Sequence, residues 1–145
     1  MKLFVVLAVL CLLLAPVVVA QQPKVMVKVD VPFEFYMANT LYPQGSYYIQ
    51  QTHNGLSTLL SPVERKAKSG YSAASAMSRP TKNADQCLVV FRRYDADHIF
   101  LKQIWHGVRQ VGWELPMSRS EREHVTVKLV TANRAETLTI LAQVR

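Results

Sequence analysis

The stretch VMVKVDVPFEFYM, residues 25–37, decides the fold class of this chain. Every odd position in it is apolar, and the positions between them include Asp30 and Glu34. Alternation of this kind predicts a strand with one face against a core. Pro32 lacks a backbone N–H, so we expect the strand to lie at a sheet edge or to divide at this residue.

The rest of the chain repeats strand patterns between turn signals. Six segments show them, at residues 46–51, 56–60, 87–94, 98–105, 125–129 and 138–144. Asn54-Gly55 and Asp95–Asp97 are typical of hairpin turns, and Ser61 and Ser118 could each cap a short helix. We predict a mainly β fold of seven or eight strands with one or two short helices. The architecture is an antiparallel sandwich or a partly open small barrel.

The N-terminus has the composition of a secretory signal peptide. Eighteen of the first twenty residues are apolar, Lys2 is the only charged one, and Val18 and Ala20 are small residues before a cleavage site. We predict cleavage near Ala20, which leaves residues 21–145 as a single exported β-rich domain in the periplasm or outside the cell. The alternative is a retained anchor, because Leu3–Ala20 just reaches the length that crosses a bilayer. After cleavage we expect no membrane span.

The number of cysteines and the absence of common catalytic motifs exclude several classes of protein. Cleavage would remove Cys11 and leave Cys87 alone, which excludes an internal disulfide and favours a buried structural thiol. The chain has no Gly-x-Ser-x-Gly elbow, phosphate-binding glycine loop or CxxC pair. We therefore expect no catalytic residues and no cofactor.

The histidines raise the question of a metal site. His98 and His106 flank one expected strand and could meet Asp95 or Asp97 in a metal cluster. Asp side chains also satisfy the backbone of turns, however. We interpret residues 95–97 as a hairpin turn and expect no metal.

Two alternative functions follow from other residues. Asp30 and Glu34 lie on the same face of the expected strand, so they could form the carboxylate pair of an envelope-glycan hydrolase. The polar loop 79–86 could instead recognise another exported protein, as an inhibitor or partner would.

The positive charge points to a binding surface. The formal net charge is +7, and Arg92, Arg93, Arg119 and Arg122 are candidate contacts for an anionic polymer or a glycan. Trp113 is a candidate stacking platform, whereas Trp105 ends a strand and is expected in the core. We expect no nucleic acid, because no motif that recognises DNA or RNA is present.

Three groups of residues taken together also carry a resemblance. They are VDVPFEF (29–35) with LYPQGSY (41–47), LVVFRRY (88–94) followed by residues 99–105, and ELPMSRSERE (114–123). In this order, behind a signal peptide, they resemble a family of small exported proteins of soil bacteria with no assigned function. The likeness covers roughly residues 25–124. It implies a β-rich fold and an exported location, and it brings no catalytic residues. We therefore expect a non-enzymatic binding or structural protein of the bacterial envelope.

Overall fold

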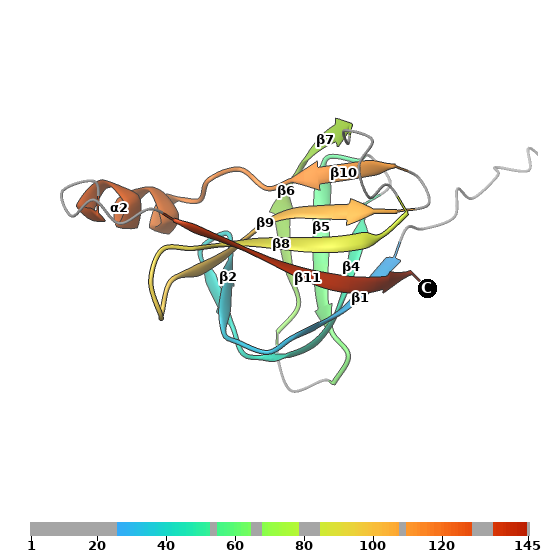
Figure 1. The fold of residues 1–145 in the computed structure, drawn as a ribbon, viewed down its shortest axis with the longest axis horizontal. Helices are drawn as coiled ribbons and strands as arrows, with labels where there is room; N and C mark the ends of the chain where they lie inside the picture. The colour runs from blue at the N-terminus through green and yellow to red at the C-terminus, as the bar shows by residue number, and fades with distance from the viewer. Residues whose placement is uncertain are drawn as a thin grey trace, which may run out of the picture.

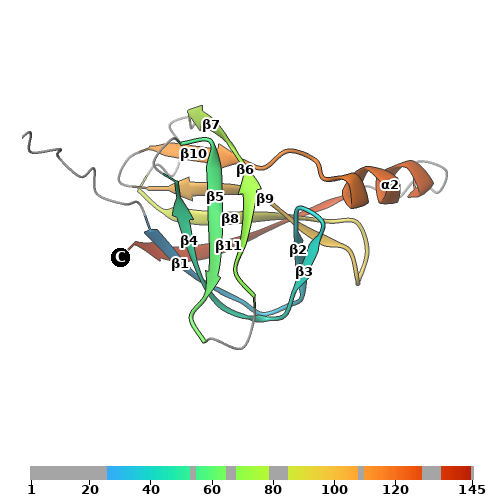
Figure 2. The same ribbon diagram turned by 180° about the vertical axis from the view of Figure 1, so that it is seen from behind.

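The computed structural model describes residues 26–52, 55–64, 68–78, 85–107, 110–128 and 135–144. This part of the chain is mainly β, as the sequence predicts, with one helix beside a twisted sheet (Figure 1, and from behind in Figure 2). The expected signal peptide, Asn54 and residues 79–84 of the predicted loop 79–86 lie outside these residues. The elements in chain order are β1 (Met26–Val31), β2 (Phe35–Met37), β3 (Thr40–Tyr42), β4 (Gly45–Gln51), β5 (Ser57–Pro62), β6 (Gly70–Ala73), β7 (Ser75–Ser78), β8 (Cys87–Arg93), β9 (Ile99–His106), β10 (Val111–Glu114), α2 (Arg119–Lys128) and β11 (Glu136–Val144).

The alternation at the start of the chain produces two strands. Val27, Val29 and Val31 of β1 are buried, while the side chains between them are partly or fully exposed. Pro32 follows the last residue of β1, and β2 begins at Phe35. Since proline cannot donate a backbone hydrogen bond, the ladder stops there. The predicted division of the strand is confirmed.

The strands form a nearly closed barrel. β1 pairs with β4 and β11, β11 with β8, β8 with β9, and β9 with β10, all antiparallel. On the other side, β4 pairs with β5, β5 with β6, and β10 with β7. Only Ala74 separates β6 from β7, and its N–H donates to the carbonyl of Leu56 at 2.9 Å. The chain therefore crosses at Ala74 from the β5 side of the barrel to the β10 side.

The β2–β3 hairpin lies beside the first half of β9, and β10 lies beside the second half. β2 pairs with β9 in parallel at Tyr36 and Phe100, which makes the sheet mixed. The hairpin contributes buried side chains, including Phe35 and Tyr42, to the barrel core.

Aromatic rings occupy the centre of this core. The Phe35 ring is 5.3 Å from those of Tyr47 and Phe91 and 5.6 Å from that of Tyr42. These four residues come from four different strands, and each is at most 3% exposed. Side chains therefore fill the middle of the barrel.

Two local predictions are wrong. Ser61 and Pro62 do not start a helix, because they continue β5 and lie opposite Tyr48 and Tyr47 of β4. The alternation at 125–129 does not form a strand, since α2 runs through residue 128. The described residues also hold eleven strands instead of seven or eight. The additional strands are short ones of three or four residues, whose patterns are too brief to detect.

Gly112 of β10 permits close contact with a side chain of the neighbouring strand β9. It pairs with Trp105 of β9, and a Cβ added at Gly112 would lie 2.3 Å from the indole ring. We expect Gly112→Ala to lower the free energy of unfolding by about 1–3 kcal/mol, because overpacking forces the ring or backbone to move. Urea denaturation followed by tryptophan fluorescence measures this. Ala76→Ser, at an exposed position of β7, is the control, with a change within about 0.5 kcal/mol. An unchanged midpoint for Gly112→Ala would contradict the contact.

Cys87 is buried at 5% exposure, and the N–H of Gly107 donates to its Sγ at 3.2 Å. It is a free thiol, so the prediction of a buried structural cysteine is confirmed.

Within the described residues, no helix combines the length and hydropathy that a bilayer span requires.

Candidate functional site

The four candidate anion-binding arginines are divided between two elements. Arg92 and Arg93 end β8, whereas Arg119 and Arg122 lie on α2. Arg93 forms an ion pair with Glu136 of β11. Arg119 Nε lies 2.8 Å from Glu123 Oε1, a hydrogen bond that raises the pKa of Arg119. Two of the four arginines therefore already have a carboxylate partner.

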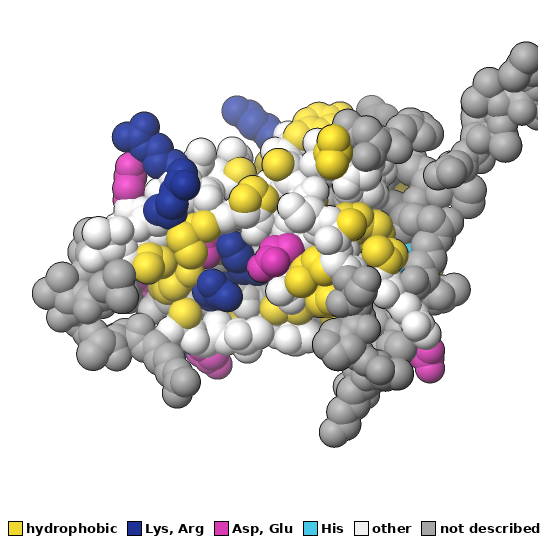
Figure 3. Space-filling view, turned by 90° about the horizontal axis from the view of Figure 1, so that it is seen from above, with side chains coloured by type: hydrophobic (Ala, Val, Ile, Leu, Met, Phe, Trp, Pro, Cys, Tyr) yellow, Lys and Arg dark blue, Asp and Glu magenta, His cyan; other side chains and the backbone are white. Residues whose placement is uncertain are grey.

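The four candidate arginines lie within the described residues, but about half of the chain's positive charge does not. All ten Asp and Glu lie within the described ranges. Nine of the seventeen Lys and Arg lie outside them: Lys2, Lys24, Arg65, Lys66, Arg79, Lys82, Arg109, Arg134 and Arg145. On the face in Figure 3, Lys and Arg side chains stand in small separate groups, and two of these groups have Asp or Glu beside them. That face carries no continuous basic patch among the residues described.

Both tryptophans are buried. Trp105 and Trp113 are each 8% exposed, which confirms Trp105 as a core residue. Trp113 belongs to the main hydrophobic cluster together with Leu115 and Ala74. Little of its ring is exposed for stacking on a sugar.

The candidate carboxylates Asp30 and Glu34 lie on either side of Pro32, and both are exposed. Asp30 is in β1 and accepts a hydrogen bond from Ser46 Oγ of β4. It also lines an open groove on the outside of the barrel. Glu34 lies beyond the end of β1 and is not among the described lining residues.

That groove has two connected parts. One part, about 630 Å³ in volume, lies between Pro32, residues 43–47 at the start of β4, and residues 62–64. The other, about 580 Å³, extends past Asp30 to residues 139–141 of β11. The two parts share four lining residues, so they adjoin where β1 ends and β4 begins.

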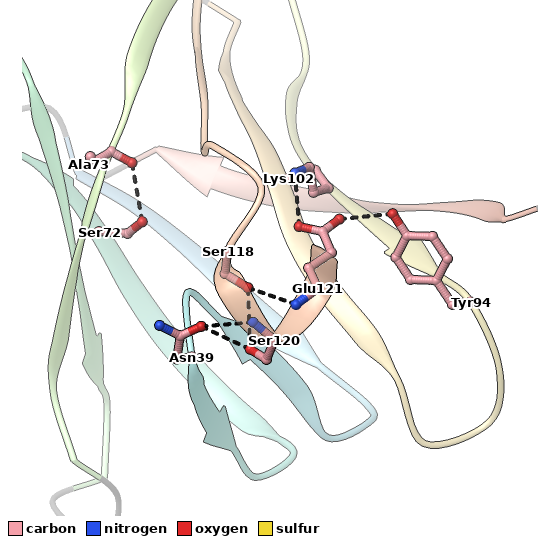
Figure 4. Close-up of polar contacts among 8 residues, drawn as sticks. All are labelled: Asn39, Ser72, Ala73, Tyr94, Lys102, Ser118, Ser120 and Glu121. Carbon is pink, nitrogen blue, oxygen red and sulfur yellow. Dashed lines mark hydrogen bonds and ion pairs between the residues drawn. The ribbon is translucent and has the colours of Figure 1, made fainter. Parts of the chain in front are cut away.

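A buried polar network, defined here as the Glu121 network, fixes α2 to the barrel (Figure 4). Lys102 Nζ of β9 lies 3.1 Å from Glu121 Oε2, and Tyr94, the residue after β8, donates to Glu121 Oε1 at 2.9 Å. Glu121 is 2% exposed and Lys102 is 6% exposed. Burial raises the pKa of the Tyr94 hydroxyl, Arg92 opposes this rise, and Glu121 adds to it. Tyr94 therefore stays protonated and can donate to the carboxylate.

The first turn of α2 is capped from two directions. Ser118 Oγ accepts from the N–H of Glu121 at 3.1 Å, which confirms the predicted cap. Asn39, in the turn between β2 and β3, accepts from the N–H and hydroxyl of Ser120 at 3.1 and 2.9 Å. Since Asn39 is 81 residues away, its capping role has no local sequence signal.

Beside this network, Asp95, His98 and His124 meet, and we name these three residues the histidine cluster. Asp95 Oδ1 is 2.7 Å from His98 Nδ1, and Asp95 Oδ2 is 3.0 Å from His124 Nε2. The two imidazole rings stack with centroids 3.8 Å apart. One candidate metal-ligand atom from each residue lies within 4.8 Å of the others.

Comparisons with protein-family models, with curated proteins and with solved structures found no match. The resemblance to small exported proteins of soil bacteria therefore stays a prediction.

The histidine cluster differs from the grouping that the sequence suggested. His98 directly precedes β9 and His106 ends it, so the two do not meet at one site. Asp95 also accepts from the N–H of Asp97 at 3.0 Å, which is the expected turn role. The partner that sequence reasoning missed is His124, 26 residues beyond His98 on α2. Its place three residues after Glu121 puts it on the same helical face, and this spacing is the signal that could have found it.

Proposed function

We propose that this chain is an exported protein of the bacterial envelope that acts by binding a glycan and not by catalysis. The export step rests on the leader-like composition of residues 1–20. The main support for glycan binding is the open groove beside Asp30 and Ser46. This groove lies on the outer surface of the barrel, whose interior is packed with side chains. A polymer reaches an outer groove without opening the core.

The chemistry of the groove suits a ligand rich in hydroxyl groups. Asp30 and Glu64 supply carboxylate oxygens, which accept hydrogen bonds, and Ser46 supplies a hydroxyl group. Pro32 and Pro43 add apolar surface beside them. Sugars present hydroxyls at their edges and C–H groups on their faces, so both kinds of surface find a partner.

The charge of the groove favours a neutral glycan over an anionic polymer. Its charged lining residues are Asp30 and Glu64, and none of the described residues that line it is Lys or Arg. A polyanion would meet two like charges there, which disfavours binding. Contact with an anionic polymer would instead depend on Arg92, Arg93, Arg119 and Arg122.

Calorimetric titration of the purified protein with soluble cell-wall oligosaccharides tests the proposal. The double variant Asp30→Asn, Glu64→Gln is expected to bind about tenfold more weakly, because weakening charged hydrogen bonds by about 1.4 kcal/mol changes Kd tenfold. Arg119→Gln, Arg122→Gln is the matched control, and its affinity should not change.

Three results would count against the proposal. The first is loss of binding only in the arginine variant, which would indicate an anionic ligand. The second is the absence of binding to every oligosaccharide by folded protein. The third is release of new reducing ends from the bound glycan, which would identify a hydrolase.

A further inference from the structure

We propose that the histidine cluster is a metal site, in which Asp95, His98 and His124 bind one divalent transition-metal ion, with zinc as the best fit. This proposal replaces the expectation from sequence that the chain binds no metal. It is independent of glycan binding, because the cluster and the groove share no residue.

The donor atoms of the three side chains lie close to one another. Two contacts, Asp95 Oδ1 to His98 Nδ1 and Asp95 Oδ2 to His124 Nε2, measure 2.7 and 3.0 Å. Zinc binds His nitrogen and carboxylate oxygen at about 2.0–2.2 Å, so tetrahedral ligand atoms lie roughly 3.3–3.5 Å apart. The donor atoms of the cluster all lie within 4.8 Å of one another. Because the two imidazole rings are stacked at 16° to each other, binding one ion requires them to tilt apart until both nitrogens face it.

His124 provides the observation that calls for a ligand. Its Nε2 has less than 1 Å² of exposed surface and makes no hydrogen bond, although Asp95 Oδ2 is 3.0 Å away. The short distance thus has poor hydrogen-bond geometry, and a buried polar atom without a hydrogen bond is costly. A cation placed between the carboxylate and the two rings would coordinate this nitrogen.

Aromatic rings pack beside both imidazoles and limit the rotamers that they can adopt. The Tyr36 ring is nearly parallel to that of His98, with centroids 6.2 Å apart, and the Tyr94 ring packs edge-on against His124 at 5.9 Å. His124 is further held by α2, which the Glu121 network anchors one turn earlier. Side chains positioned by packing lose less conformational freedom when a metal binds.

The ligand set determines the class of metal. Two imidazoles and one carboxylate suit zinc and similar divalent transition metals, whereas calcium and magnesium prefer oxygen ligands. The three side chains remain 16–38% exposed, so water can occupy the remaining coordination position. Bound metal would join the β8–β9 turn to α2.

Titration of the full chain with zinc chloride, after treatment with a chelator and its removal, tests the site. We expect one zinc ion per chain and a higher melting temperature with zinc, because the metal binds the folded form. His98→Ala and His124→Ala should each weaken zinc binding by about 100-fold or more, since even residues that only orient ligands change affinity 10–100-fold. Asp97→Asn, an exposed carboxylate in the same turn, is the matched control and should retain the affinity.

Cobalt(II) provides a test that needs no variant, because zinc has no visible spectrum. We expect the unmodified chain to show cobalt absorption bands that an equivalent of zinc removes. The proposal is overturned if folded protein binds neither metal, or if zinc binds equally well to both histidine variants. The cobalt result decides the question even where a histidine variant fails to fold.

Discussion

Replacing Glu121 by alanine is expected to lower the free energy of unfolding by about 3–5 kcal/mol, which is the usual cost of removing one partner of a buried ion pair. The variant leaves the Lys102 ammonium at 6% exposure without its carboxylate. It also leaves the Tyr94 hydroxyl without its acceptor. A cost of this size is a large part of the stability of a small domain, so a urea or thermal denaturation series should detect it clearly.

The same helix supplies the control for this experiment. Glu123 also pairs with an arginine, at 2.8 Å, but both side chains are mostly exposed. Glu123→Ala should therefore cost less than about 1 kcal/mol. The double variant Lys102→Met, Glu121→Leu should recover much of the loss, because an apolar pair needs no compensating charge. Equal effects of Glu121→Ala and Glu123→Ala would show that burial of the ion pair has no consequence.

Phe35→Ala is expected to destabilise the protein by about 3–5 kcal/mol, the range for removing a large aromatic side chain from a core. The ring is 1% exposed and contacts Tyr42, Tyr47 and Phe91. Its removal leaves a cavity where four strands meet, and the surrounding rings cannot all move inward to fill it. Chemical denaturation gives the free energy, and near-ultraviolet circular dichroism should show looser packing of the aromatic rings.

Leu41→Ala is the matched control for Phe35→Ala. Leu41 lies on the paired strand β3 but is 48% exposed, so its truncation should cost well under the lower end of that range. If Phe35→Ala unfolds at the same denaturant concentration as Leu41→Ala, the placement of the Phe35 ring at the centre of the core is wrong.

Local periodicity predicted the strands well where one face of a long strand meets the core. The odd positions of β1 and the turn at Asp95–Asp97 are examples, since period-two burial and Asp-rich turns leave a clear local signal. The same pattern failed at Val125, where α2 continues. There the Ser118 cap and the contacts of Glu121 with Tyr94 and Lys102 favour a helix over the intrinsic preference of valine for strands.

The candidate sites were harder to predict because they depend on contacts between distant residues. Asp95 and His124 are 29 positions apart, and they meet only because α2 packs beside the β8–β9 turn. The groove likewise joins residues of β1, β4 and β11 that no local pattern connects. The predicted arginines are ordinary in sequence and were chosen for charge alone, whereas the structure gives Arg93 and Arg119 their own carboxylate partners.

The position of β11 between β1 and β8 has a consequence for synthesis. Both of these strands emerge from the ribosome well before residues 136–144, so each has one unpaired edge until β11 is made. The barrel therefore cannot close until residues 136–144 are made, and a fragment that stops before residue 136 exposes two edges that can pair with other chains. Folding of the complete barrel is therefore limited by a contact between segments more than 100 residues apart, Met26–Val31 and Glu136–Val144.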